Sequence, residues 1–139
     1  MKLKMNFAFW FVITVNFALP SGQAEPAADA QIQHGKYLVE RVGMCADCHS
    51  PRDQKGEFIR SKWLQGSTLA FQPVHPMPFD PVAPGIAGLP MFTTDAQAVT
   101  FFETGTNNLG KLALPPMPQV RFNHEDAVAV TAYLRSLKK

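Results

Sequence analysis

Cys45-Ala46-Asp47-Cys48-His49 is the stretch of this 139-residue chain that decides its fold. If these residues form a helical turn, Cys45, Cys48 and His49 occupy positions i, i+3 and i+4, which share one face. Two thiols on one face can form thioethers with the two vinyl groups of a porphyrin, and the histidine that follows is then placed as an axial ligand of the iron. The spacing Cys-x-x-Cys-His therefore predicts one covalently attached c-type haem.

The first 24 residues have the layout of a secretory signal peptide. Lys2 and Lys4 form a basic start, residues 7–19 are apolar, and the small residues Gly22 and Ala24 precede an expected cleavage site after Ala24. The apolar run is short for a membrane span. We therefore expect export to the periplasm and no membrane span in the mature form, with a retained anchor or a later cut as the alternative.

The mature chain is expected to carry no net charge. Cleavage removes Lys2 and Lys4 from the 13 basic residues and leaves 11 basic against 11 acidic residues. No basic stripe interleaved with aromatic residues is present, so nucleic acid is not expected as a partner. The remaining length suits one domain, with residues 25–30 as a flexible leader and residues 31–139 as the domain.

Three helices are predicted from the apolar spacing, over residues 31–44, 94–104 and 124–137. Thr94 with Gln97 forms a capping-box pattern, and Gly105 stands where a C-terminal cap belongs. Asn123 is the expected N-cap of the last helix.

Gly35 is costly inside the first predicted helix, so we expect another helix to approach closely there. Residues 50–62 are polar and are expected to form an exposed loop. Residues 73–90 contain six prolines, which makes regular helix or strand improbable and predicts a long proline-rich loop that wraps a flat cofactor.

A six-coordinate iron needs a ligand opposite His49, and Met117 is the favoured candidate. It lies between Pro116 and Pro118, which stiffen the backbone around a weak thioether ligand. The ordinary alternative for a lone methionine is an apolar filler. Other candidates for this ligand are Met91, Met77 and His75.

Two readings without haem are open to the same cysteines. Cys45 and Cys48 could bind zinc together with histidines such as His49, His75 or His124, but these histidines lack the paired spacing of zinc sites. A dithiol oxidoreductase would need a βαβ context, which the sequence does not show. His34 and His124 are read as solvated helix residues.

Taken in order, these motifs resemble a mono-haem class I cytochrome c. The chain is most similar to the group whose domains also serve as cytochrome subunits of periplasmic dehydrogenases. The matching segments are residues 35–38, 45–49, 83–88, 93–105, 116–118 and 126–137.

The resemblance implies an all-α fold in which the first and last helices cross beside the haem, with Gly35 near Tyr133. It also implies that the backbone carbonyl of Pro84 accepts the Nδ1 proton of His49, and that Met117 is the sixth ligand. Residues 63–81 match no pattern of the family.

The expected function is that of an electron carrier, not an enzyme, which shuttles single electrons between redox proteins such as a dehydrogenase, an oxidase or another cytochrome. It is expected as a monomer or as a subunit of a hetero-complex. The alternative is a haem protein with a labile sixth ligand that binds a gas or peroxide.

Trp63 is expected either to contact a haem propionate or to belong to the core. The basic loop residues, read either as a docking border or as a solvated loop, are Arg52, Lys55, Arg60 and Lys62.

Overall fold

A computed structural model describes residues 24–137. The expected signal peptide, residues 1–24, lies outside the described residues apart from Ala24. In the part of the chain that is described, no helix combines the length and the apolar character that crossing a bilayer requires.

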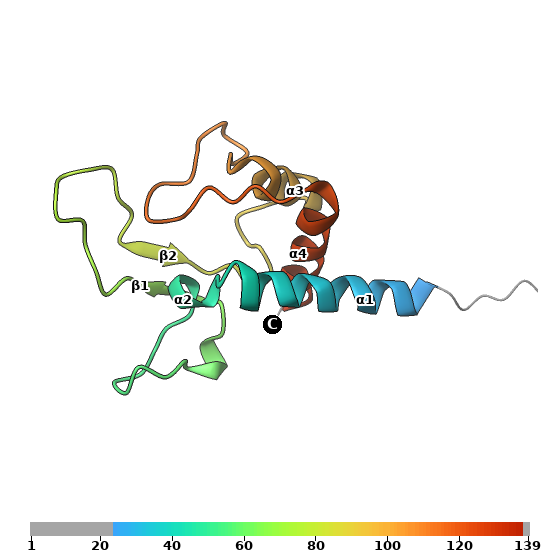
Figure 1. Ribbon diagram of the computed structural model, residues 1–139, viewed down its shortest axis with the longest axis horizontal. Helices are drawn as coiled ribbons and strands as arrows, with labels where there is room; N and C mark the ends of the chain where they lie inside the picture. The colour runs from blue at the N-terminus through green and yellow to red at the C-terminus, as the bar shows by residue number, and fades with distance from the viewer. Residues whose placement is uncertain (1–23, 138–139) are drawn as a thin grey trace, which may run out of the picture.

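The described chain is mostly helical, as the sequence predicts, and its first and last helices pack against each other (Figure 1). The helical elements are α1 (Ala24–Tyr37), the π-helical turn η1 (Leu38–Val42), α2 (Ala46–His49), the 3₁₀ turn η2 (Arg60–Lys62), α3 (Asp95–Thr104) and α4 (His124–Ser136). Two short strands, β1 (Gly66–Thr68) and β2 (Val82–Pro84), pair antiparallel. In Figure 1, β1, β2 and α2 lie toward one end of the molecule, α3 and α4 lie beyond its middle, and the start of α1 forms the other end.

The first helix differs from the expectation at both ends. It begins at Ala24, so residues 25–30 are helical where a flexible leader was expected. Alanine has the highest helix propensity, and Pro26 falls in the first turn, where its missing N–H costs no hydrogen bond. The helix then loosens into η1, in which the N–H of Gly43 donates to the carbonyl of Leu38 at 2.7 Å.

Gly35 is the point at which α1 crosses α4, as expected. A Cβ atom at this position would overlap the carbonyl oxygen of Ala129 and would lie 2.9 Å from the Cβ of Tyr133. Only glycine allows the two backbones to approach this closely. The crossing is the centre of a core whose buried members include Val39, Val130 and Leu134.

The caps predicted for α3 and α4 are present. The side chain of Thr94 accepts from the N–H of Gln97, whose side chain in turn accepts from the N–H of Thr94. Gly105 has a φ of 72°, the left-handed conformation of a C-terminal cap. The side chain of Asn123 accepts from the N–H of Asp126 at 2.8 Å.

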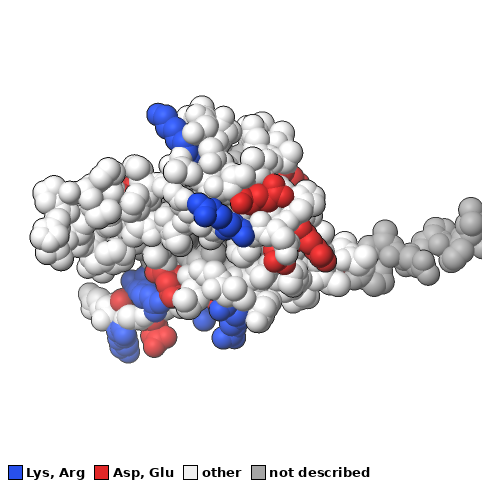
Figure 2. All heavy atoms as spheres, turned by 45° about the horizontal axis from the view of Figure 1, so that its top comes forward, with Lys and Arg blue, Asp and Glu red and all other residues white. Residues whose placement is uncertain are grey.

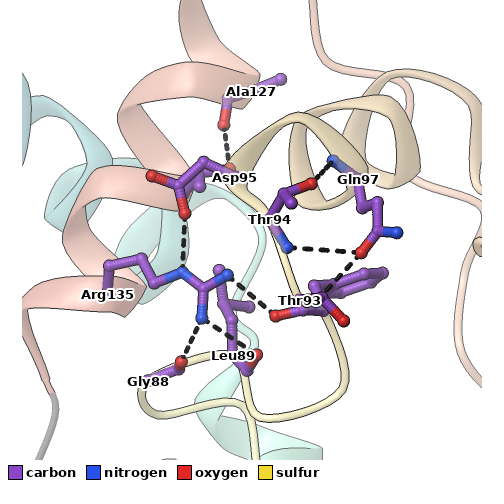
Figure 3. A network of polar contacts seen from close by, with 10 residues as sticks. Gly88, Leu89, Thr93, Thr94, Asp95, Gln97, Ala127 and Arg135 are labelled. Atoms are coloured by element: carbon purple, nitrogen blue, oxygen red, sulfur yellow. Dashed lines mark hydrogen bonds and ion pairs between the residues drawn. The ribbon is translucent and has the colours of Figure 1, made fainter.

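Arg135 ties the segment after β2 to the last helix (Figure 3). Its guanidinium donates to the carbonyls of Gly88 at 2.8 Å and Phe92 at 2.9 Å, and its Nε lies 2.8 Å from the carboxylate of Asp95. The N–H of Gly88 donates to the carbonyl of Leu134 at 2.8 Å. The chain between β2 and α3 is therefore fixed to α4 by polar contacts as well as by packing.

Candidate functional site

The Cys-x-x-Cys-His stretch forms one helical turn in the structure. Cys45 has helical backbone angles, and its carbonyl accepts from the N–H of His49 at 2.9 Å. Cys48 lies on the same turn, and both cysteines are half-buried and free. The turn therefore places both thiols and the imidazole on one face, as their spacing requires.

His49 is held by a single polar contact from its ring. Its Nδ1 lies 2.6 Å from the carbonyl oxygen of Pro84, and its side chain is buried. Burial lowers the pKa of His49 below its usual value, and the hydrogen bond to Pro84 opposes this shift only in part. The imidazole is therefore neutral at neutral pH, the form that binds metals.

The second ring nitrogen of His49, Nε2, is available for a further interaction. Among the described residues, Nε2 has no hydrogen-bond partner, and no buried side-chain nitrogen or oxygen lacks one. Nε2 must therefore open onto accessible space. A histidine whose Nδ1 donates to a backbone carbonyl and whose Nε2 is open has the arrangement of a metal ligand fixed in one tautomer.

The carbonyl of Pro84 is positioned by the small sheet. Pro84 pairs with Gly66, which has a φ of 94° and lies so close to the opposite strand that a Cβ would be 2.8 Å from the nitrogen of Gly85. A Cβ on Gly85 would in turn lie 2.9 Å from the carbonyl oxygen of Gln65. These strands were not predicted, because each spans only three residues and β2 lies inside the proline-rich segment.

Met117 is half-buried in a turn of the loop between α3 and α4. Its N–H donates to the carbonyl of Leu114 at 3.1 Å, and the carbonyl of Pro115 accepts from the N–H of Asp80 at 2.8 Å. Because Asp80 also accepts from the N–H of Val82 in β2, this turn is fastened to the strand that holds Pro84. No hydrogen bond among the described residues joins Met117 to His49 directly, and both are linked by hydrogen bonds to β2 or its flank.

The other candidates for the second axial ligand are more exposed than Met117. The side chains of Met77 and Met91 are exposed, and so is that of His75. Met117 is the one member of this set that is half-buried.

Trp63 is half-buried and packs against the core. Its ring meets that of Phe58 edge-on at 5.3 Å, and the guanidinium of Arg60 lies 4.6 Å from its centroid. Its side chain also interacts with the hydroxyl of Tyr133. Of the two roles expected for Trp63, these contacts are those of a core residue whose polar atom has a protein partner.

The basic loop carries two kinds of side chain. Arg52 pairs with Asp47 at 2.9 Å and lies 3.7 Å from the centroid of the Phe58 ring, so it shapes the loop, as does Arg60. Lys55 and Lys62 are exposed. Figure 2 shows basic and acidic side chains interspersed on this face of the molecule.

The readings without haem gain no support in the described part of the chain. No group of three or more His, Cys, Asp or Glu side chains gathers there as a metal site would require. Burial raises the pKa of the Cys45 thiol to about 11. A reactive dithiol has a lowered pKa instead.

His34 and His124 are exposed, as expected, but each has a carboxylate partner. His34 lies 2.7 Å from Asp126 and connects α1 with α4. His124 lies 2.8 Å from Glu103 and connects α4 with α3.

The end of the molecule that carries His49 in α2 suits a large apolar cofactor (Figure 1). The two long loops, residues 69–81 and 105–122, and the strand β2 leave large apolar side chains about half exposed. These side chains are Phe71, Met77, Val82, Leu112 and Leu114. A porphyrin with apolar faces would give such side chains a partner, so the residues present fit a haem.

Sequence reasoning missed two residues near the site. Ser50 is buried beside His49, and Leu64 has a φ of 55°, an uncommon conformation for a leucine. Their contacts are between segments far apart in the chain, and neither has a local sequence signature.

Comparison with known proteins found one partial likeness. A stretch of 47 residues, 34% of this chain, is 40% identical to a protein of Cereibacter sphaeroides named "Diheme cytochrome c-type". The match covers 16% of that protein, so the chain matches about a sixth of the length of this curated relative. No protein-family model matches the chain.

Proposed function

We propose that this chain is a c-type cytochrome that carries single electrons and is not itself an enzyme. Cys45 and Cys48 would attach one haem c, and His49 would bind its iron through Nε2. The observation that carries the proposal is the helical turn that gathers these three side chains, with the Nδ1 of His49 held by Pro84 and the Nε2 open. The haem would supply one-electron redox chemistry.

The partial likeness to a cytochrome c-type protein supports the same cofactor. That relative is named a diheme protein, whereas this sequence holds two cysteines and one Cys-x-x-Cys-His stretch. Attachment through cysteine pairs therefore allows one haem in this sequence. We therefore propose one haem for this chain, and the resemblance of its sequence segments supports assigning it to the mono-haem class I cytochromes, in the group related to cytochrome subunits of periplasmic dehydrogenases.

Met117 is the proposed sixth ligand. It is half-buried, and its turn is fastened through Asp80 to the strand that fixes Pro84. A thioether on a rigid support would oppose His49 in both oxidation states with little rearrangement. Thioether ligation raises the reduction potential, which suits an electron carrier.

The proposed setting is the periplasm, reached through the signal peptide of residues 1–24. The partners would be redox proteins, which include a dehydrogenase, an oxidase or another cytochrome. The chain would act as a free carrier or as the cytochrome subunit of a complex. Exposed Lys55 and Lys62 would border the docking surface.

The test is expression of the full chain in a host that has a cytochrome c maturation system. The mature protein should be coloured, and its mass should exceed that of the polypeptide by one haem. The oxidised wild type should be low-spin and should show the sulfur-to-iron charge-transfer band. Met117→Ala should lose this band, whereas Met91→Ala, a matched change at an exposed methionine, should keep it.

Two results would contradict the proposal at different levels. A colourless product with the mass of the bare polypeptide would exclude covalent haem. A high-spin oxidised wild type would keep the haem but remove the methionine ligand. That second result would favour the alternative, a protein that binds a gas or peroxide.

A further inference from the structure

Ser50 is the most buried polar side chain near the candidate site. It directly follows His49, and 1% of its surface is exposed. Its Oγ accepts a hydrogen bond of 2.8 Å from the N–H of Leu64. A buried hydroxyl that holds a backbone group 14 residues away fixes the distance between the two segments.

Leu64 passes this constraint on to the segment that carries Pro84. Its carbonyl accepts from the N–H of Ile86 at 2.8 Å and from the N–H of Ala87 at 3.0 Å. Ile86 is two residues beyond Pro84, whose carbonyl accepts from the Nδ1 of His49. The hydrogen bonds therefore form a closed circuit. It runs from Ser50 to Leu64, from Leu64 to residues 86–87, and from the nearby carbonyl of Pro84 back to His49, which is adjacent to Ser50.

The backbone of Leu64 shows that its surroundings determine this geometry. Leu64 is fully buried and has a φ of 55°, which is strained for a residue with a branched side chain. Such a conformation persists only where neighbouring contacts over-determine it. Hydrogen bonds on both the N–H and the carbonyl of Leu64 supply those contacts.

The geometry points to Ser50 as a positioning residue for His49. Its hydroxyl holds Leu64, Leu64 holds Ile86 and Ala87, and these residues set the Pro84 carbonyl that accepts from the imidazole. Ser50 acts on His49 through this circuit. The inference rests on the proposed function, in which His49 is an axial ligand.

Removing the Ser50 hydroxyl should change the properties of His49 as a ligand as well as the stability of the protein. A firm hydrogen bond from Nδ1 makes the imidazole a more basic ligand, which favours ferric iron and lowers the reduction potential. Ser50→Ala should loosen the Pro84 carbonyl and raise the reduction potential. The Nδ1 proton of His49 should exchange with solvent about tenfold faster, the change that corresponds to one lost hydrogen bond.

The test uses the haem-loaded full-length protein. Proton exchange at the His49 ring is followed by NMR in the ferrous state, and the potential is measured by redox titration. Ser50→Thr, which keeps the hydroxyl, should retain both wild-type values. Ser136→Ala removes the hydroxyl of an exposed serine of α4, which donates to the carbonyl of Tyr133, and should leave the potential and the ring exchange unchanged.

The outcomes separate this inference from the proposed function. A wild-type product without haem overturns both. A haem-loaded Ser50→Ala protein with wild-type potential and exchange overturns only the role of Ser50. If Ser50→Ala yields no holoprotein, Ser50→Thr is compared with Ser50→Val. Valine has the shape of threonine but lacks the hydroxyl that accepts from the N–H of Leu64. Equal potentials in that pair would overturn the inference, and a higher potential in the valine variant would support it.

Discussion

Gly35 lies directly against the carbonyl group of Ala129, with no room between the two helices for a side chain. This contact sets the spacing of α1 and α4, and α1 leads through η1 into the Cys-x-x-Cys-His turn. The helix crossing and the candidate site are therefore parts of one rigid arrangement.

Gly35→Ala should destabilise the protein even though alanine favours helix. The new methyl group would overlap the Ala129 carbonyl, and α1 would have to move away from α4. The helix-propensity gain of about 1 kcal/mol offsets only part of this cost. We expect a net loss of about 2 kcal/mol in the free energy of unfolding, measured by guanidinium titration of the haem-loaded protein.

A substitution on the exposed side of the same helix is the control. Gln33→Ala changes a solvated residue of α1 and should leave the free energy of unfolding within about 0.5 kcal/mol of the wild type. A Gly35→Ala variant as stable as Gln33→Ala would show that the two helices lie farther apart than described.

Arg135→Met should be among the most destabilising substitutions outside the site. It would leave the carbonyls of Gly88, Leu89 and Phe92 without the donor that now serves them. We expect a loss of about 3 kcal/mol in the free energy of unfolding, because buried acceptors would lose a charged partner. Arg135→Lys should recover only part of this loss, since an ammonium group cannot reproduce the planar fork.

Asp95→Asn tests whether the ion pair or the carbonyl contacts of Arg135 matter more. The carboxylate of Asp95 is exposed, so its loss should cost less than about 1 kcal/mol. If Asp95→Asn were as harmful as Arg135→Met, the contacts to the three carbonyls would not be the main role of Arg135.

Helix positions could be predicted from the sequence where the signals are local. Thr94 and Gln97 define the start of α3 within four residues, and Gly105 defines its end by its left-handed backbone. Asn123 does the same for the start of α4. The crossing at Gly35 was also predictable, because glycine is costly inside a helix and the close approach of another helix accounts for its presence.

The rest depends on contacts between distant segments. Pairing of Gly66 with Pro84 joins two three-residue strands, too short to leave an alternating pattern. The conformation of Leu64 depends on Ser50 and on Ile86, which no local motif connects. Residues 25–30 were expected as a flexible leader, whereas α1 begins at Ala24, because proline is tolerated in the first turn of a helix.

The Tyr133 hydroxyl should make the stability of the protein fall at alkaline pH. Burial raises the pKa of its hydroxyl to about 12, and the hydrogen bond of 2.5 Å that it donates to Glu40 adds to this shift. The unfolded chain releases the same proton near pH 10. Stability from this group is therefore complete below about pH 10 and falls as the pH rises toward 12, by at most about 1.4 kcal/mol per pH unit.

Tyr133→Phe should flatten this alkaline decline, because phenylalanine has no proton to lose. The free energy of unfolding of the haem-loaded protein is measured from about pH 8 to about pH 12, a range that covers roughly both pKa values. Tyr37→Phe is the matched control, since the side chain of Tyr37 is exposed, and it should follow the wild-type curve. An unchanged decline in Tyr133→Phe would exclude Tyr133 as its source.

Loss of the covalent haem should affect the two long loops more than the helix crossing. The core around α1 and α4 is built from contacts between protein side chains, among them Val39, Val130 and Leu134. The loops of residues 69–81 and 105–122 instead leave apolar side chains half exposed and are joined by one main-chain hydrogen bond, between Asp80 and Pro115.

In the double variant Cys45→Ala/Cys48→Ala, hydrogen exchange in both loops should therefore be faster than in the haem-loaded protein by about tenfold or more, because regions with few buried contacts open first. The exchange is measured by mass spectrometry. Exchange in α4 should increase less, since its partners in α1 and α3 remain. Equal protection of the loops in the two proteins would mean that the haem does not pack against them, and the apolar side chains there would then need a different partner.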